Sequence, residues 1–362
     1  MAEQNEPTRE DGSETSADER RGRLPESLGP RRAIEIVGIA TTAVLAVVMV
    51  GFVLAYALQN LPVVGGLYEG YRTFGRVLDA LLGTNVFRYP FMWQALATGV
   101  LIGIVAPLVG TFLVHREMAL IGETLAHTAF AGIAIGLLVS GTTAWSGSLL
   151  LVALVVAILG ALGVQWLAEH TDAYGDVPIA IMLTGSFAIG TLIISWGRGL
   201  AAVNIEGFLF GDAAVVPPEG AQLMTVLSVA VVGVVAYTYK QLLFITFDEQ
   251  AARVARLNVS GYNALLVVMT AVVVVGAMQI LGVILVAAML VIPVAAATQI
   301  AGGFRETISL SIILGQCSVL GGFALAIGMS LPPGGSIVVV AIGFYLLAIA
   351  ASSKSMAAIS TH

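Results

Sequence analysis

Two ionisable side chains, Glu123 and His127, stand four residues apart within an apolar segment. In a helix this spacing places both side chains on one face, one turn apart. Ionisable groups inside a membrane-spanning segment are costly, and they generally face the protein interior or a wet pathway. A carboxylate and an imidazole on the same face are also suited to binding a divalent transition-metal ion. This pair is therefore the first candidate for chemistry in the chain.

Two interpretations of the pair are open from the residues alone. The first is a transient metal site or gate in a transport pathway, and the second is a buried acid–imidazole hydrogen bond that joins two helices. Two ligands do not complete a metal site, so further ligands would come from a second copy of the chain or from residues that line the pathway. Three candidates for such lining are Gln279, Met278 and Asn204, and each of them also fits a packing or helix-joining role.

The composition defines the setting of this pair. Of the 362 residues, 58% are hydrophobic and only 10% are charged, whereas a soluble domain carries about 25% charged residues. The mean hydropathy is +0.96. This composition predicts an all-α, polytopic membrane protein. The single cysteine, Cys317, excludes a disulfide framework within the chain.

Runs of roughly 20 apolar residues predict about ten transmembrane helices. The long apolar segment 262–300 is expected to hold two of them, broken around Gly276–Gly282 with Gln279 in the break. The other predicted spans are 33–58, 91–114, 118–139, 146–167, 179–196, 221–245, 308–330 and 336–350.

The segments outside these spans differ in character. Residues 1–30 are polar and charged, and are expected to form a disordered cytoplasmic tail. Residues 31–90 hold an extra N-terminal span and a linker, which includes a short interfacial helix near Tyr71–Leu82. Segment 198–220 is too broken for a span and too apolar for a free loop, so we expect a re-entrant or interfacial piece packed against protein. Residues 353–362 form a C-terminal tail.

A polar stretch, 247–261, separates two predicted spans and favours a short amphipathic helix at the membrane surface. Asp248 is placed to cap this helix, and Glu249 follows in its first turn, where the helix dipole favours an acid. Two arginines near the far end suit the dipole as well, and Gly261 is expected to close the helix. Such a helix is suited to meeting a soluble partner.

The distribution of basic residues predicts the orientation. Ten spans place both termini on one side, and basic residues close to the membrane are more numerous on that side. They are Arg31, Arg32, Arg116, Lys240, Arg253, Arg256, Arg305 and Lys354, against Arg72, Arg76, Arg88 and Arg198 on the other side. By the positive-inside rule we expect a multi-pass protein of the cell membrane with both termini in the cytoplasm.

Several catalytic motifs are absent from the sequence. It has no Gly-x-x-x-x-Gly-Lys-Ser/Thr phosphate loop, so this chain does not hydrolyse ATP by that route. It has no His-Glu-x-x-His motif, and its four histidines form no dense cluster. A transporter has no use for a tight cluster, because the ion must leave as well as enter. We therefore expect no enzymatic activity, no permanently bound cofactor and no nucleic-acid partner.

The segment 116–127, Arg-Glu-Met-Ala-Leu-Ile-Gly-Glu-Thr-Leu-Ala-His, resembles the signature of the permeases of zinc and manganese ABC importers, the ABC-3 family. Further resemblances follow in the family's order. They are Leu209–Asp212, Phe247–Glu249 with Ala252, Met278–Pro293, and Pro333-Gly334 with Ser336–Val338. The resemblance covers residues 91–350 and predicts an ABC-3-like permease domain at 91–352.

This resemblance implies a type II-like ABC importer. Two copies of the permease would form the pore in the lipid membrane, ABC ATPase subunits would dock on the coupling helices, and an extracytoplasmic solute-binding protein would deliver Zn2+ or Mn2+. In the family, the acid and the histidine of the signature are implicated in handling the ion, which points here to Glu123 and His127. The residues implied in coupling to the ATPase are Phe247, Asp248, Glu249, Ala252, Arg253 and Arg256.

Three positions depart from the family pattern. Glu123 replaces an aspartate, Ala131 replaces a proline, and Arg256 stands where the coupling segment usually has glycine. Two other functions stay open. One is an ABC permease for a metal chelate such as cobalamin or a siderophore, against which the paired ionisable residues argue. The other is a proton-coupled secondary metal carrier, in which the coupling-like helix would have no partner.

Overall fold

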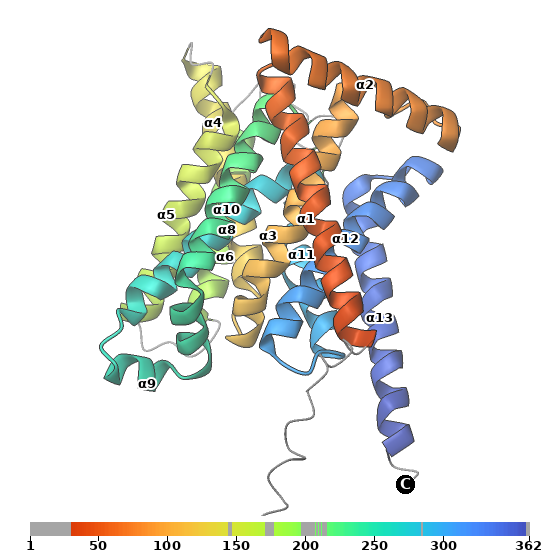
Figure 1. The fold of residues 1–362 in the computed structure, drawn as a ribbon. Coiled ribbons are helices and arrows are strands. Elements are labelled where there is room, and N and C mark those ends of the chain that lie inside the picture. The colour runs from red at the N-terminus through yellow and green to blue at the C-terminus, as the bar shows by residue number, and fades with distance from the viewer. Residues whose placement is uncertain are drawn as a thin grey trace, which may run out of the picture.

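The computed structural model describes residues 30–143, 147–170, 177–196, 216–283 and 285–359, together with 207, 209 and 211. All regular structure in these residues is helical (Figure 1). The helices are α1 (Pro30–Ala57), α2 (Pro62–Leu82), α3 (Pro90–His115), α4 (Ile121–Thr142), α5 (Leu149–His170), α6 (Val177–Trp196), α8 (Pro218–Phe247), α9 (Glu249–Val254), α10 (Val259–Leu281), α11 (Val286–Thr298), α12 (Phe304–Met329) and α13 (Pro333–Ile359).

Nine of the described helices are long and apolar enough to cross a membrane. A further apolar helix, α11, has only 13 residues and follows α10 after a short break. Together these helices confirm the predicted all-α, polytopic class and account for the expected number of about ten. The two other described helices, α2 and α9, are not among the candidate spans. The predicted tail at 1–30 falls, apart from Pro30, outside the described residues, as does most of segment 198–220.

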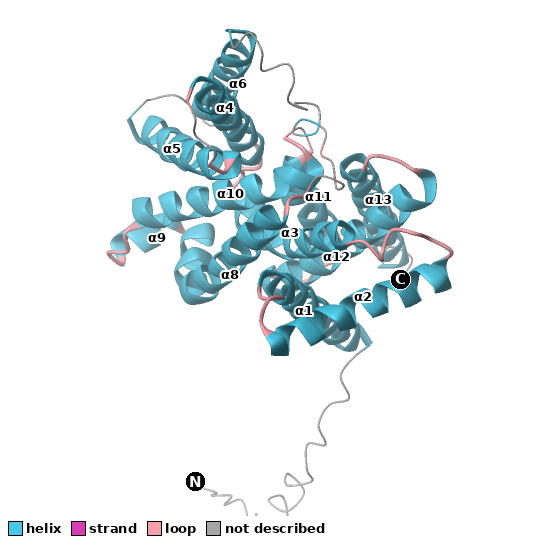
Figure 2. Ribbon diagram, turned by 90° about the horizontal axis from the view of Figure 1, so that it is seen from above, coloured by secondary structure: helices cyan, strands magenta, loops and turns pink. Residues whose placement is uncertain are grey.

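Helix α3 is the centre of the bundle. The view along the bundle axis shows it surrounded by α8, α10, α11 and α12 (Figure 2). Accordingly, 89% of the residues in the most apolar stretch of α3 are buried inside the molecule, against 22% of those in the corresponding stretch of α1 at the periphery. The Gln316 amide on α12 donates a 2.6 Å hydrogen bond to the Val100 carbonyl on α3, which ties two neighbouring spans together. The outer helices leave their apolar side chains exposed, as lipid contact requires.

The predicted break in the apolar segment 262–300 is present but begins later. Helix α10 continues through Gln279 to Leu281, so the expectation that Gln279 lies in the break is wrong. The last turn stays helical because Ile280 and Leu281 are buried in the core. The chain then turns at Gly282, whose φ of 76° lies in the left-handed region that favours glycine.

The helix expected near Tyr71–Leu82 is also longer than predicted. It begins at Pro62, where a proline costs nothing because the first N–H groups of a helix have no partner within it. The sequence alone does not indicate its first turns, because Gly65 and Gly66 lower helix propensity there. Figure 1 shows α2 lying across one end of the bundle, transverse to the spans. Helix α9, the beginning of α1 and the end of α13 lie at the opposite end.

Asp79 organises the turn that leads from α2 to α3. Its carboxylate is buried and accepts hydrogen bonds of 2.9–3.3 Å from the Thr84 hydroxyl, from the backbone N–H groups of Val86, Phe87 and Arg88, and from the Arg88 guanidinium. Burial alone would raise the pKa of this carboxyl, but the hydrogen bonds from the turn hold the pKa below its ordinary value of 3.8.

We expect Asp79→Ala to destabilise the protein by roughly 2–3 kcal/mol, because several buried donors lose their acceptor at once. Thermal unfolding of the purified protein measures the effect. Since the folded pKa is lowered, the stabilisation is complete above the ordinary carboxyl pKa and is lost only as the pH falls through the folded value. The exposed ion pair of Glu69 with Arg72 supplies the control, and Glu69→Ala should change stability by less than about 0.5 kcal/mol. Equal effects of the two variants would contradict this role of Asp79.

Candidate functional site

Helix α4 carries the two candidate metal ligands near its start. It begins at Ile121, three residues later than predicted, so Glu123 lies in its first turn and His127 about 9 Å from its start. The delay follows from how α3 ends: Glu117 is left-handed, with φ 58°, and the Met118 N–H donates back to the Leu113 carbonyl at 2.9 Å. Both residues therefore lie in the first half of a candidate membrane span, towards its start.

The two side chains are half-buried and leave ligand atoms available. The His127 ring lies edge-on to Phe187 of α6, with ring centroids 4.9 Å apart. Its Nδ1 atom is buried and has no hydrogen-bond partner. Among the described residues, Glu123 and His127 form neither a hydrogen bond nor an ion pair with each other. The acid–imidazole bond of the second interpretation is thus not formed in this conformation.

Small and hydroxyl-bearing residues hold α4 against its neighbours. The Thr124 hydroxyl contacts the Ile179 carbonyl at 3.3 Å, and the Thr128 and Ser186 hydroxyls are 3.0 Å apart, so both contacts join α4 to α6. On the other side, a Cβ on Gly160 of α5 would come within 2.3 Å of the Thr128 methyl group. Such close approach is typical of helix pairs in membranes. Helix α4 also runs without interruption through the position of Ala131.

The pair does not find further ligands in the described part of the chain. No group of three or more His, Cys, Asp or Glu residues there could hold a metal ion. Of the proposed lining residues, Met278 is completely buried in the core, which places it away from any wet pathway in this conformation. Asn204 and the side chain of Gln279 lie outside the described residues.

The surface helix predicted at 247–261 is shorter than expected. Asp248 caps α9 by accepting a 2.8 Å hydrogen bond from the Ala251 N–H, as predicted. The helix ends near Ala255, so the expectation that Gly261 closes it is wrong. Gly261 instead lies in the first turn of α10, where its N–H donates to the Asn258 side chain at 3.0 Å.

The chain leaves α9 through Arg256. This residue adopts φ 60°, and the following N–H donates to the Ala252 carbonyl at 3.1 Å. That is the left-handed helix ending at which glycine is most common. The geometry explains why glycine is usual at this position of the pattern noted in the sequence, since a glycine takes this conformation without strain, whereas Arg256 bears the strain.

Helix α9 is anchored on one side and open on the other. Ala252 is fully buried against Ile245 and Val259, which fixes α9 to the ends of α8 and α10. Phe247 and Val254 are exposed large apolar side chains at the same end of the bundle. The predicted coupling segment therefore combines a buried contact, which fixes α9 to the bundle, with an exposed apolar surface.

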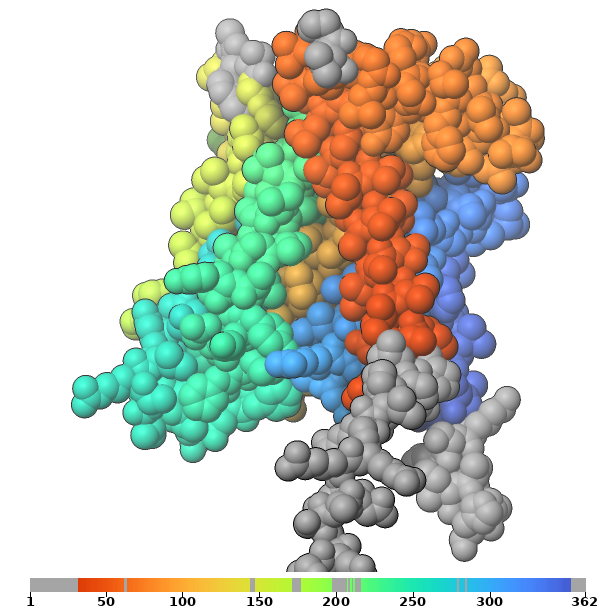
Figure 3. Space-filling view, in the orientation of Figure 1, coloured from red at the N-terminus to blue at the C-terminus, as the bar shows by residue number. Residues whose placement is uncertain are grey.

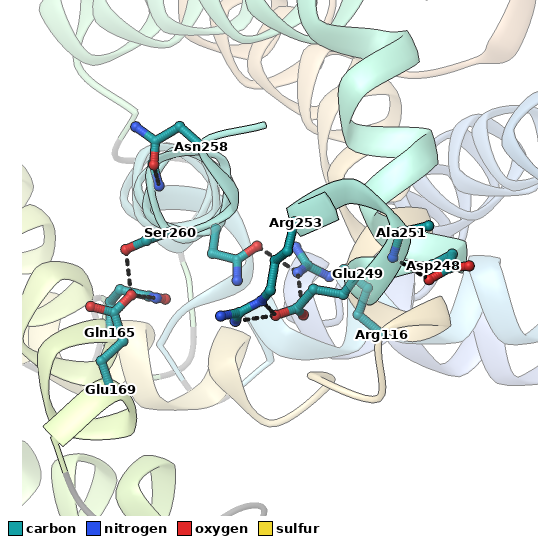
Figure 4. A network of polar contacts seen from close by, with 11 residues as sticks. Arg116, Gln165, Glu169, Asp248, Glu249, Ala251, Arg253, Asn258 and Ser260 are labelled. Carbon is teal, nitrogen blue, oxygen red and sulfur yellow. Dashed lines mark hydrogen bonds and ion pairs between the residues drawn. The ribbon is translucent and has the colours of Figure 1, made fainter. Parts of the chain in front are cut away.

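A further charged residue, Arg116, links this surface to α4 (Figure 4). Its side chain is only 7% exposed. It donates a 2.5 Å hydrogen bond to the Asn263 side chain of α10 and lies 3.8 Å from the Glu249 carboxylate of α9. Glu249 in turn accepts a 2.6 Å hydrogen bond from Arg253. Burial lowers the pKa of the Arg116 guanidinium, against the opposing effect of Glu249, but an arginine stays charged.

In the sequence, Arg116 stands within the signature and among the basic residues that predict the orientation, but no local pattern there indicates a functional role for it. The available signal was its place in the charged break just before α4. A cleft of about 410 Å3 opens beside it, between the start of α4 and the facing ends of α5 and α6. Across this region Glu169 of α5 accepts hydrogen bonds from Gln165 and from Ser260 of α10 (Figure 4). Polar contacts thus join α5, α9 and α10 to one another and to the break between α3 and α4 at this end.

Comparison with known proteins identifies the architecture as that of a type II ABC importer permease. A solved ABC transporter of the metal-chelate type, in an inward-facing conformation, aligns over 87% of this chain and 98% of its own, with a TM-score of 0.57 and 15% identity, which shows the fold alone. PsaBC from Streptococcus pneumoniae, solved in complex with Fab, aligns over 76% of this chain and 95% of its own, with a TM-score of 0.65 and 27% identity.

The chain belongs to the ABC 3 transport family, whose model matches residues 88–352. The manganese transport system membrane protein MntC of Listeria monocytogenes is 29% identical over 264 residues, which are 73% of this chain and 91% of that protein. The protein is therefore a multi-pass membrane permease subunit of an ABC transporter and not its catalytic subunit. Helices α1 and α2 precede the region that the family model matches.

We expect Arg256→Gly to stabilise the protein by about 1 kcal/mol, because glycine adopts the left-handed conformation without the cost that arginine bears. Arg253→Gly, the same change in the last turn of α9, should instead destabilise it by about 1 kcal/mol, because glycine has a low helix propensity and the hydrogen bond to Glu249 is lost. Thermal unfolding of the two purified variants provides the comparison. A lowered transition temperature for Arg256→Gly would show that the arginine side chain outweighs its backbone strain.

Proposed function

We propose that this permease imports a divalent transition-metal ion, manganese or zinc, and that Glu123 and His127 bind the ion on its way through the membrane. The observation that carries this proposal is the buried, unbonded Nδ1 of His127, one helical turn from a carboxylate. A buried nitrogen without a partner is unfavourable, and a passing metal ion would satisfy it. The similarity to a manganese transport permease supports the same cargo.

A second copy of the chain completes the site in this proposal. One chain offers one carboxylate and one imidazole, which is half of a four-ligand set. Two copies facing one another across a pore would offer two of each. Because these ligands come from different subunits, a change in the distance between the subunits would release the ion, as transport requires.

The ATPase subunit docks on α9 in this proposal, and the solute-binding protein delivers the ion at the end that carries α2. The exposed Phe247 and Val254 beside a buried Ala252 support the first contact. Basic residues near the membrane are more numerous at the α9 end than at the α2 end, so the positive-inside rule supports cytoplasmic termini. Those at or near helix ends on the α9 side are Arg32, Arg116, Lys240, Arg253, Arg256 and Arg305, against Arg72, Arg76 and Arg88 on the α2 side. A secondary carrier would leave the apolar surface of α9 without a partner.

Arg116 transmits the movement of α9 to the metal-binding helix in this proposal. The guanidinium lies between Glu249 on α9 and Asn263 on α10, and only four residues separate it from the start of α4. A buried charge that keeps its partners moves with them, because leaving it unpaired is costly. Displacement of α9 would therefore shift the first turn of α4, where Glu123 lies.

We expect Glu123→Ala and His127→Ala to lower metal accumulation by roughly tenfold or more, a loss in the range seen when metal sites are disturbed. Total cell metal is measured by mass spectrometry in a deletion strain grown metal-poor and complemented with each variant at matched membrane expression. The metal that falls on deletion identifies the cargo. Glu123→Asp keeps the carboxylate and restores the residue usual in the family, so it should retain transport. Full accumulation in both alanine variants would show that the pair is structural.

We expect Arg116→Gln to separate ATP hydrolysis from transport. In proteoliposomes that contain the assembled transporter, metal uptake per ATP hydrolysed should fall by roughly fivefold or more, the size of a typical coupling energy. Arg305→Gln removes an exposed arginine and should leave the ratio unchanged. A parallel loss of uptake and hydrolysis would instead indicate that Arg116 only supports assembly.

A further inference from the structure

Helix α2 has three distinct faces, which its helical spacing separates by about 110–130° each. The first is an apolar stripe formed by Leu67, Phe74, Val77 and Leu81 (hereafter the α2 stripe), at intervals of seven, three and four residues. These four side chains are 50–76% exposed, and no described element covers them. An uncovered apolar stripe of this length needs an explanation, because it would be costly in contact with water.

The second face holds α2 on the bundle. Tyr71 donates a 2.8 Å hydrogen bond to the Val48 carbonyl of α1, and its ring lies 6.0 Å from that of Trp93 on α3. Tyr68 and Phe52 complete this aromatic cluster. Gly75 permits close approach, since a Cβ there would come within 2.2 Å of the Phe87 carbonyl oxygen. Together with Asp79, these contacts fix the rotation of α2 about its own axis.

The third face is polar and exposed. It carries Glu69, Arg72, Thr73, Arg76 and Ala80. Arg72 pairs with Glu69 at 3.0 Å, and Arg76 contacts the Thr73 hydroxyl at 3.0 Å. With one acid against two arginines, this face has a net positive charge.

The position of α2 restricts what its two free faces can meet. Figures 1 and 3 show it across the end of the bundle, directly after α1 and before α3, both of which are candidate spans. A transverse helix at the end of two spans lies at the level of the membrane surface. When one of its faces packs on protein, the other two can be divided between water and hydrocarbon. The apolar side chains Leu54, Leu58 and Leu61 at the junction with α1 are also exposed, so the apolar surface continues from the span into α2.

We propose that α2 is a membrane-surface anchor, with the α2 stripe in the hydrocarbon of the leaflet at the end opposite α9 and the arginines at its lipid phosphates. Its amphipathic character and transverse position are those of an interfacial helix, whose apolar face enters the boundary by about 5–10 Å. A lipid surface fits the stripe better than a soluble partner does, because the exposed apolar surface is continuous with that of α1. The anchor would hold the α1–α3 junction at a fixed depth.

Spin labels on single cysteines test this proposal. The exposed Cys317 is first replaced by serine, and labels are attached at Val77 or Leu81 in the stripe and at Thr73 or Ala80 on the polar face. The full chain is placed in phospholipid nanodiscs, and collision with oxygen, which concentrates in hydrocarbon, is compared with collision with a water-soluble nickel chelate. Val47, an exposed position within α1, provides the reference for a lipid-facing label.

The proposal requires labels at 77 and 81 to favour oxygen, as the label at 47 does, and labels at 73 and 80 to favour the nickel chelate. Preference for nickel at all four α2 positions would show that the stripe faces water and would overturn the proposal. Protection of 77 and 81 from both reagents would also overturn it, because protein, such as a second copy of the chain, would then cover the stripe. All labelled positions are exposed, and gel filtration before reconstitution verifies that each variant is folded.

Discussion

A buried guanidinium is the constraint on which the α9 end of this protein depends. Arg116 is almost completely removed from solvent, and a charge in that position is tolerable only with polar partners nearby. It finds them in Glu249 and in Asn263, which is 147 residues away in the sequence. The break between α3 and α4, the surface helix α9 and the start of α10 must therefore lie together. The same requirement brings the proposed ATPase-docking surface next to the helix that carries Glu123 and His127.

The membrane imposes the second constraint. In hydrocarbon every backbone polar group must be paired, so the chain crosses as helices and breaks them only where protein or the surface can satisfy the ends. Glu117 and Arg256 show how tightly these breaks are made, because both adopt left-handed conformations that let the following N–H close the preceding helix. Where helices must approach closely, as at Gly160 beside Thr128, a missing side chain permits it.

The N-terminal unit is attached by a different kind of interaction. Helices α1 and α2 precede the region shared with the family, and an aromatic cluster around Phe52, Tyr71 and Trp93 joins them to α3. Asp79 then fixes the turn into α3 by accepting backbone hydrogen bonds. Because none of these contacts reaches α4 or α9, the unit can set the position of the bundle in the membrane without entering the proposed ion path or coupling surface.

The sequence by itself determined nine of the spans, because a run of about 20 apolar residues is long enough to cross hydrocarbon as a helix. It also determined the Asp248 cap, whose partner is three residues away. Only the tertiary structure decided where helices begin and end: packing keeps Gln279 within α10, and the left-handed Glu117 delays α4, which moves Glu123 into its first turn. The role of Arg116 depends on its contact with Asn263, 147 residues away, and the uncovered face of α2 depends on which of its faces packs against α1 and α3. Local spacing does not encode such contacts, because they arise only when the helices pack.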